Sequence, residues 1–93
     1  MRTLEWRFAA QRDLLAIVEY IADDNPNAAQ QLKDDIESKA AQLPHHPELY
    51  RAGRVANTRE MVVRTNYVLI YTIGKDRVSV LRVLHAAQQW PNL

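Results

Sequence analysis

One segment, Tyr67–Ile73, constrains the fold more than any other part of the chain. Its side chains are apolar on both alternating faces: Tyr67, Leu69, Tyr71 and Ile73 on one, and Val68 and Ile70 on the other. Successive side chains of a strand point to opposite faces, so this segment needs apolar cover on both sides. We therefore expect it to be a central strand in a sheet that is covered on each face.

Three further segments have the pattern of strands. Residues 59–63 precede the central segment, and Arg77–His85 follows it after the turn signal Gly74-Lys75-Asp76. Residues 4–8 alternate apolar and polar side chains, which is the period of a half-buried strand. The short links between the last three segments predict an antiparallel meander.

Two helices are expected between the first strand and the others. Over residues 9–23 the apolar positions follow helical spacing, at Leu14, Ile17, Val18 and Ile21. A second helix begins with Asn25 as its capping residue and Pro26 in the first helical position, and ends before the proline-containing segment 43–47. Its apolar stripe recurs every four residues, at Ala28, Leu32, Ile36 and Ala40. The small alanines predict close packing of the two helices as a hairpin.

The resulting order is β-α-α-β-β-β, and residues 1–93 form a single domain. The fold class is α+β, with the helical hairpin packed on one face of a mainly antiparallel sheet. We expect the C-terminal tail, with Trp90 and Leu93, to cover part of the other face and a partner protein to cover the rest. A large exposed apolar patch is uncommon on a monomer that acts alone.

Composition excludes several classes of protein. The chain has no cysteine, which excludes a disulfide scaffold, a thiolate zinc site and a cysteine nucleophile. Its apolar runs are far shorter than the roughly 20 residues of a membrane span, and its N-terminus has no apolar signal core. We therefore expect a cytoplasmic protein that does not contact a membrane.

Charge is unevenly divided along a chain whose net charge is +1. Residues 1–48 hold five Lys or Arg and nine Asp or Glu, a net −4, whereas residues 49–93 hold seven and two, a net +5. The asymmetry indicates either an anionic partner for the second half or two parts of one domain that complement each other. Dedicated nucleic-acid binders are usually more basic overall.

No metal or cofactor site is expected. His45 and His46 are adjacent in a loop, where neighbouring side chains point apart, and no acidic or Cys partner stands at zinc-like spacing. The acidic pairs on or beside the helices are interpreted as solvated charges. With two glycines in all, the chain has no glycine-rich phosphate loop.

Residues 81–91 carry the strongest chemical pattern, because Arg82, His85 and Trp90 follow one another there. Strand periodicity places Arg82 and His85 on opposite faces if the strand stays regular to its end. His85 is either a general acid or base, since histidine titrates near neutral pH, or a residue whose hydrogen bond ends the strand. Trp90 is interpreted as a plug of the core.

Three segments in order resemble the RelE/ParE toxin superfamily and together span essentially the whole chain. They are His-Pro-Glu-Leu-Tyr-Arg after the helical hairpin, the block from Gly-Arg-Val to Asn-Tyr-Val-Leu-Ile-Tyr, and Val-Leu-Arg-Val-Leu-His-Ala-Ala-Gln-Gln-Trp-Pro near the C-terminus (residues 46–51, 53–71 and 80–91). The resemblance implies the β-α-α-β-β-β fold and a bacterial type II toxin–antitoxin module. It also implies a disordered antitoxin segment that folds across the toxin, so a toxin–antitoxin hetero-oligomer is expected.

The superfamily divides in mechanism. RelE-like members cleave mRNA on the ribosome with basic residues and a general acid or base, whereas ParE-like members share the fold, lack that catalytic set and poison DNA gyrase. The Gly-Arg-Val, Asn-Tyr and Gln-Trp-Pro sequences resemble the ParE branch. Val62 or Val63 stands where nuclease members carry an arginine, and Ala86 stands where some of them carry a tyrosine after the histidine.

We therefore expect a ParE-like toxin that inhibits DNA gyrase by direct binding and is neutralised by a cognate antitoxin. The alternative is a RelE-like, ribosome-dependent mRNA endonuclease with His85 as acid or base and Arg82 as phosphate clamp. A third hypothesis is an interaction module that has lost its toxicity. The candidate target-binding residues are Arg59, Arg64, Arg82, His85 and Trp90. The candidate antitoxin-binding residues are Tyr67, Leu69 and Tyr71.

Overall fold

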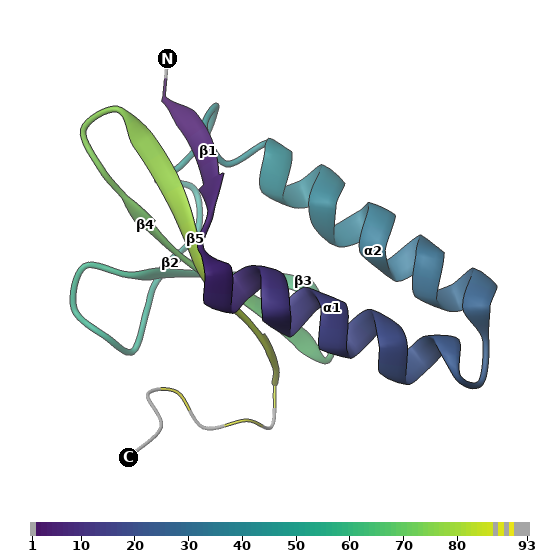
Figure 1. The fold of residues 1–93 in the computed structure, drawn as a ribbon. Coiled ribbons are helices and arrows are strands. Elements are labelled where there is room, and N and C mark those ends of the chain that lie inside the picture. The colour runs from purple at the N-terminus through teal and green to yellow at the C-terminus, as the bar shows by residue number, and fades with distance from the viewer. Residues whose placement is uncertain (1, 87, 89, 91–93) are drawn as a thin grey trace.

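The computed structural model describes residues 2–86, 88 and 90, and it has two layers: a pair of helices packed on one face of a five-stranded sheet (Figure 1). The elements in chain order are β1 (Thr3–Trp6), α1 (Phe8–Ala22), α2 (Pro26–Ala41), β2 (Arg51–Ala52), β3 (Arg59–Arg64), β4 (Tyr67–Ile73) and β5 (Arg77–His85). The strand order across the sheet is β1-β5-β4-β3-β2, so β4 is central, as its doubly apolar pattern predicts. Neighbouring strands are antiparallel except β1 and β5, which are parallel.

Two features differ from the expectation. β2 lies between the second helix and residues 59–63, where the sequence patterns predicted no strand, and it pairs antiparallel with the start of β3. Both of its residues are exposed, so it has no apolar alternation that a sequence pattern could reveal. The expected first strand of residues 4–8 is too long: it ends at Trp6, and Phe8 begins α1 with 72% of its surface exposed. The helical hydrogen bonds start there, with Gln11 N donating to Arg7 O.

The sheet face under the helices holds the main hydrophobic core. The buried strand residues of this core are Met61, Val63, Leu69, Tyr71, Val78, Val80 and Val83. The buried residues that the helical segment places against them are Ala10, Leu14, Leu32, Ile36, Ala40 and Leu43. Each large aliphatic side chain buried in this way stabilises the fold by about 1.5–3 kcal/mol. Both predicted helical stripes therefore face the core, although Ala28 is only half-buried.

The second helix begins as its sequence predicts. Asn25 has an extended backbone, and its Oδ1 accepts a hydrogen bond from Ala28 N at 3.0 Å. Pro26 occupies the first helical position, where its missing N–H leaves no hydrogen bond unmade. Near the other end of α2, Lys39 donates to the carbonyl oxygen of Val63, which links the helix to β3.

We call the side of the sheet away from the helices the open face. Val68, Ile70 and Leu84 form a second, smaller cluster there, with the half-buried Leu81 and Trp90 packed against it. Trp90 thus covers part of this face, and Leu93, which the sequence assigns to the same cover, lies outside the described residues. In the described part of the chain, neither helix has the length and apolar character needed to cross a membrane.

Candidate functional site

The open face carries charged side chains on strands whose other side is buried in the core. A row of paired residues crosses four strands of this face: Arg51 on β2, Glu60 on β3, Ile70 on β4 and Arg82 on β5. Directly paired residues of adjacent strands project to the same side of a sheet. Because Ile70 belongs to the open-face cluster, the charged members of the row lie on the open face as well.

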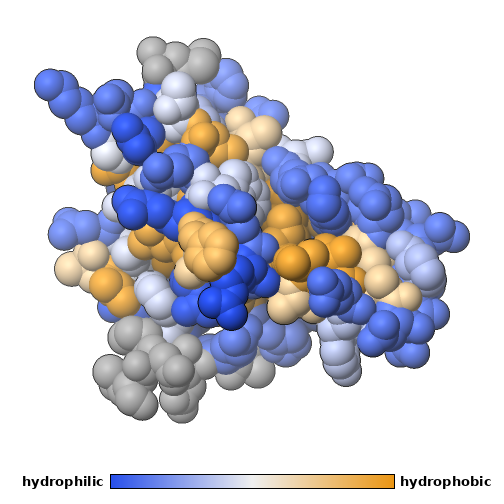
Figure 2. Space-filling view, viewed as in Figure 1, coloured by the Kyte–Doolittle hydropathy of each residue, from blue (hydrophilic) through white to orange (hydrophobic). Residues whose placement is uncertain are grey.

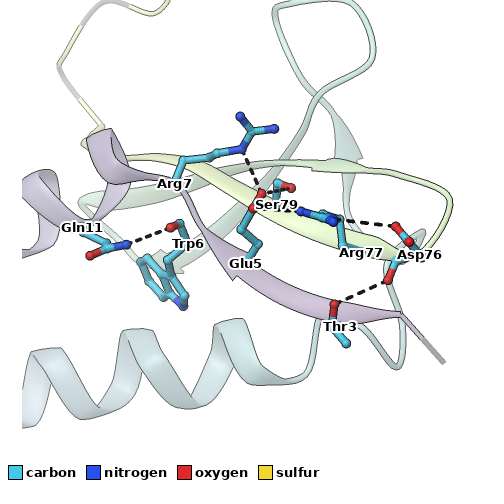
Figure 3. Close-up of polar contacts among 8 residues, drawn as sticks. All are labelled: Thr3, Glu5, Trp6, Arg7, Gln11, Asp76, Arg77 and Ser79. Carbon is cyan, nitrogen blue, oxygen red and sulfur yellow. Dashed lines mark hydrogen bonds and ion pairs between the residues drawn. The ribbon is translucent and has the colours of Figure 1, made fainter.

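Glu5 organises one charged cluster at the β1 edge of this face (Figure 3). Its Oε1 accepts a hydrogen bond from Ser79 Oγ at 2.8 Å and lies 3.0 Å from Arg7 Nε, while its Oε2 lies 3.1 Å from Arg77 Nη1. The Ser79 hydrogen bond and the two arginines together hold the pKa of Glu5 below its ordinary value of 4.5. Figure 3 shows Trp6 pointing the other way, toward α2. The alternation of β1 therefore separates this polar cluster from the core.

Glu60 organises a second cluster at the opposite edge. Its side chain is 3% exposed, and Arg51 Nη2 donates to its Oε1 at 3.0 Å. Its Oε2 accepts from Arg54 N at 3.1 Å and lies 3.3 Å from Arg54 Nε. The loop closes tightly beside it, since a Cβ on Gly53 would stand 2.1 Å from Thr58 Oγ1. The carboxylate is buried beneath two arginines whose guanidinium groups reach solvent.

Arg82 is held by α1. The pairing of Ile70 with Arg82 and of Tyr71 with Val80 leaves Leu81 as an extra residue in β5, a β-bulge. Arg82 Nε and Nη2 contact the two oxygens of Asp13 at 2.6 and 3.0 Å, and Val83 N donates to Asp13 Oδ2 at 3.0 Å. The hydrogen bond that Arg82 donates to Asp13 raises the pKa of Arg82.

The guanidinium of Arg82 also lies over the Trp90 ring, 5.8 Å from its centroid. This arginine therefore links α1, the bulge in β5 and the tail. The indole N–H of Trp90 is buried and has no hydrogen-bond partner among the described residues.

His85 lies at the exposed end of β5 and is paired with Tyr67. The two rings meet edge to face, with centroids 5.5 Å apart. His85 N donates to Gln88 Oε1 at 2.7 Å. Tyr67 packs against the main core, whereas the partner of Arg82 belongs to the open-face cluster, so His85 and Arg82 leave the sheet on opposite faces.

The other two candidate arginines bind their own chain on the helical side. Arg59 Nη1 donates to the carbonyl oxygens of Tyr50 at 2.8 Å and Glu48 at 3.2 Å. Arg64 Nε donates to Asp35 Oδ2 at 3.0 Å, and this bond, with the nearby Lys39, lowers the pKa of Asp35. Of the five target-binding candidates, the fold brings together only Arg82 and Trp90.

The three antitoxin-binding candidates lie on the helix-covered face. Leu69 and Tyr71 are fully buried, and Tyr67 is half-buried. The Tyr71 hydroxyl donates to the carbonyl oxygen of Pro47, and burial raises the pKa of Tyr71 to about 12. In this conformation Leu69 and Tyr71 offer no surface to a partner, so only Tyr67 is accessible for such a contact.

A groove in the helical layer offers a different docking surface that the sequence analysis missed. It encloses about 240 Å³ between the two helices and β1. Its lining residues are Trp6, Gln11, Leu14, Leu15, Val18, Lys33 and Glu37. Figure 2 shows apolar side chains gathered between α1 and α2. Leu15 is 58% exposed beside the groove, and this departure from the buried stripe of α1 is the signal that the sequence contains.

The sequence analysis also missed the open-face arginines Arg7, Arg51, Arg54 and Arg77. Strand alternation contains the signal for Arg7 and Arg77, because the flanking Trp6 and Val78 are apolar core residues. The two arginines beside Glu60 carry no such signal, since they lie on a two-residue strand and in a loop. His45 and His46 are exposed, and the described residues contain no group of three or more potential metal ligands.

Comparison with known proteins finds a matching family and similar proteins that are all described as toxins. The sequence model of the family described as ParE toxin of the type II toxin–antitoxin system parDE matches residues 4–90. A Sinorhizobium fredii protein named "Putative toxin Y4kP" is 37% identical over 99% of this chain and 96% of its own. Toxin RelE2 of Caulobacter vibrioides is 35% identical over 95% of this chain and 99% of its own.

A solved structure has closely similar architecture. A chain of the chromosomal ParDE toxin–antitoxin system from P. aeruginosa superposes with a TM-score of 0.85 at 20% identity, covering 91% of this chain and 96% of that one. A chain of the RelBE2 toxin–antitoxin complex from Mycobacterium tuberculosis gives a TM-score of 0.58 at 22% identity, covering 90% and 96%. Both comparisons support the same two-layer fold.

Proposed function

Because the chain belongs to the ParE toxin family of type II toxin–antitoxin systems, we propose that it inhibits DNA gyrase by direct binding. It acts in the cytoplasm, where gyrase works, and a cognate antitoxin neutralises it. The toxin needs no cofactor in this mechanism. Its effect comes from surface contacts that stall gyrase with cleaved DNA.

The observation that carries the proposal is the separation of Arg82 from His85. A ribonuclease must place a proton-transferring group and a cation at the same phosphate. Here the two side chains leave the sheet on opposite faces, and Arg82 is engaged by both oxygens of Asp13. Arg82 instead lies over Trp90, and tryptophan and arginine are enriched among residues that dominate interface energies. This arrangement favours a binding surface over a catalytic centre.

The second candidate function is a ribosome-dependent mRNA endonuclease. Two relatives from Caulobacter vibrioides, 35% and 33% identical to this chain, are named Toxin RelE2 and Toxin RelE3. His85 is exposed at a strand end, where it can reach a bound macromolecule. In this mechanism His85 transfers the proton and the arginines of the sheet bind the phosphates.

The antitoxin partner has a suitable surface in the groove between α1 and α2. Trp6, Leu14 and Val18 line an apolar channel beside the exposed Leu15, with Lys33 and Glu37 also lining it. An amphipathic helix binds such a groove through residues at helical spacing. A small antitoxin segment that folds on binding would stabilise the toxin, because it binds only the native state. The similar solved structure from P. aeruginosa belongs to a toxin–antitoxin system, which supports an antitoxin as the partner.

Two reactions with purified protein test the function. We expect it to inhibit supercoiling by gyrase with accumulation of cleaved DNA, and to leave mRNA intact on programmed ribosomes. His85→Gln removes proton transfer near neutral pH, and in the nuclease mechanism it should reduce cleavage by roughly 10²–10⁴-fold. In the gyrase mechanism the same variant should weaken inhibition only modestly. Cleavage of mRNA by the wild type that a folded His85→Gln variant loses would establish the nuclease instead.

A further inference from the structure

The two layers of the molecule carry opposite charge. Residues 8–41, which form the helical layer, hold three basic and seven acidic side chains, a net −4. The other described residues, which form the sheet, its loops and the start of the tail, hold nine basic and four acidic side chains, a net +5. The uneven charge of the sequence is therefore a separation in space. A molecule of this kind orients its sheet toward a polyanion and its helices away from it.

The open face concentrates this positive charge at its surface. Its arginine side chains Arg7, Arg51, Arg54 and Arg77 are between 45% and 59% exposed. The carboxylates that pair with them are covered more deeply, at 34% for Glu5 and 3% for Glu60. The acidic groups thus hold the guanidinium groups in place from below, while the donors at the surface remain accessible. Arginine is suited to this use because its planar fork matches a phosphate.

We propose that the open face binds the phosphate backbone of duplex DNA. This inference rests on the proposed function, in which gyrase holds the DNA that the toxin contacts. Arg51 on β2 and Arg7 at the end of β1 lie at opposite edges of this face, four inter-strand spacings apart in the strand order, roughly 19 Å at about 4.8 Å each. The major groove of B-DNA is roughly 12 Å wide, so the long, exposed side chains of these two arginines can reach the phosphates of both strands that border it.

The side chains of the open face favour duplex DNA over single-stranded RNA. Proteins that bind single strands stack successive bases on exposed aromatic rings. Among the described residues, Trp90 is the one aromatic side chain in the open-face cluster, and its ring packs against Val68, Ile70 and Leu84. The face therefore offers phosphate contacts without a stacking platform. Binding of this kind is independent of base sequence and sensitive to salt.

The test measures fluorescence anisotropy of a short labelled duplex, titrated with the full chain at several KCl concentrations. We expect binding that weakens with salt and is tighter than binding to single-stranded RNA of matched sequence. Arg51→Gln and Arg77→Gln should each raise Kd roughly three- to tenfold and reduce the salt slope by about 0.9. The charge-matched control is Lys39→Gln on α2, whose side chain pairs with Asp35 in the helical layer. This control should bind as the wild type does.

Thermal unfolding checks each variant, because Arg51→Gln leaves the buried Glu60 with Arg54 alone. Arg77→Gln keeps the test decisive if Arg51→Gln is unstable, since Glu5 retains Ser79 and Arg7. The inference is overturned if the wild type binds no duplex at low salt, if RNA binds more tightly, or if Lys39→Gln loses as much affinity. The gyrase reaction separates the two proposals. Inhibition without duplex binding refutes the DNA surface alone, whereas duplex binding through the open-face arginines without inhibition refutes gyrase as the target alone.

Discussion

The two faces of the sheet are built from the same strands and differ in almost everything else. On the helix-covered face Leu69, Tyr71 and Val78 are fully buried in one continuous core. On the open face a small cluster beside Trp90 is surrounded by arginines that are paired with covered carboxylates. Alternate residues of one strand thus serve different purposes. The covered face holds the continuous apolar core, and the open face presents charge that is ordered by its own ion pairs.

The largest expected effect comes from a charge placed on the covered side. Leu32→Asp buries an unpaired carboxylate in a site that is 3% exposed, so we expect the domain to unfold. Val62→Asp on the open face is the matched control. Because Val62 is half-exposed, this substitution should lower the free energy of unfolding by no more than about 1 kcal/mol. Circular dichroism with thermal melting measures both. A folded Leu32→Asp protein with an unchanged midpoint would mean that Leu32 does not pack in the core under the helices.

A smaller loss is expected at the contact that joins the two layers. Asp13→Ala removes the acceptor for Arg82 and for the N–H of Val83. Val83 lies beyond the part of β5 that pairs with β1, so its N–H would lose its hydrogen bond to Asp13. Because these hydrogen bonds involve charged groups, Asp13→Ala should lower the free energy of unfolding by about 2–3 kcal/mol, which urea denaturation measures. Asp34→Ala on the exposed side of α2 is the control, since it loses one hydrogen bond from Gln30. Equal effects of the two variants would show that Asp13 is an ordinary surface residue.

Trp90 measures how much the open face contributes to stability. Trp90→Ala uncovers the small cluster of Val68, Ile70 and Leu84, and we expect a loss of about 1–2 kcal/mol because the ring is half-buried. Trp90→Phe keeps an aromatic ring and removes a buried indole N–H that has no partner in the described part of the chain, so its loss of stability should be smaller. Thermal midpoints compare the two. A larger loss with Phe than with Ala would indicate that the N–H makes a bond essential to the fold.

The smallest expected effect is a dependence on acid pH. The pKa values of Glu5 and Asp35 lie below their ordinary values of 4.5 and 3.8 in the folded chain. The folded state therefore binds these protons less readily than the unfolded chain, so this stability is present above about pH 4.5 and declines as the pH falls through the lowered values. Glu5→Gln and Asp35→Asn each remove one of these carboxylates, so each variant should lose less unfolding free energy than the wild type as the pH falls. Unfolding free energies between pH 3 and pH 6 test this, and identical slopes in the wild type and both variants would contradict it.

Sequence patterns predicted the elements and most of the core, and the reason is that these patterns are local. The spacing of Leu32 and Ile36 and the double apolarity of Tyr67–Ile73 depend on residues two to four positions apart. The cap at Asn25 spans three residues. The patterns failed at β2, whose two exposed residues show no alternation. They also failed at Phe8, because the alternation of apolar and polar residues continues past Trp6, where β1 ends.

The candidate site was less accessible to sequence analysis because its contacts join distant parts of the chain. Arg82 meets Asp13 across 69 positions, and Glu5 meets Ser79 across 74. The first pair depends on the bulge at Leu81, and the second on the parallel register of β1 with β5. Which apolar face of Tyr67–Ile73 the helices would cover was also undetermined, since both alternating sets are apolar.

The amino-acid sequence by itself determined the order of helices and strands, the central place of β4 and membership of the toxin family. Periodicity and motifs are properties of residues close together in the chain, so they can be recognised in the sequence without a structure. Only the tertiary structure decided that Leu69 and Tyr71 are buried, that Arg59 and Arg64 bind their own chain, and that the open face collects the exposed arginines. These outcomes depend on register and on which face the helical hairpin covers, and both are set by packing among residues far apart in the chain.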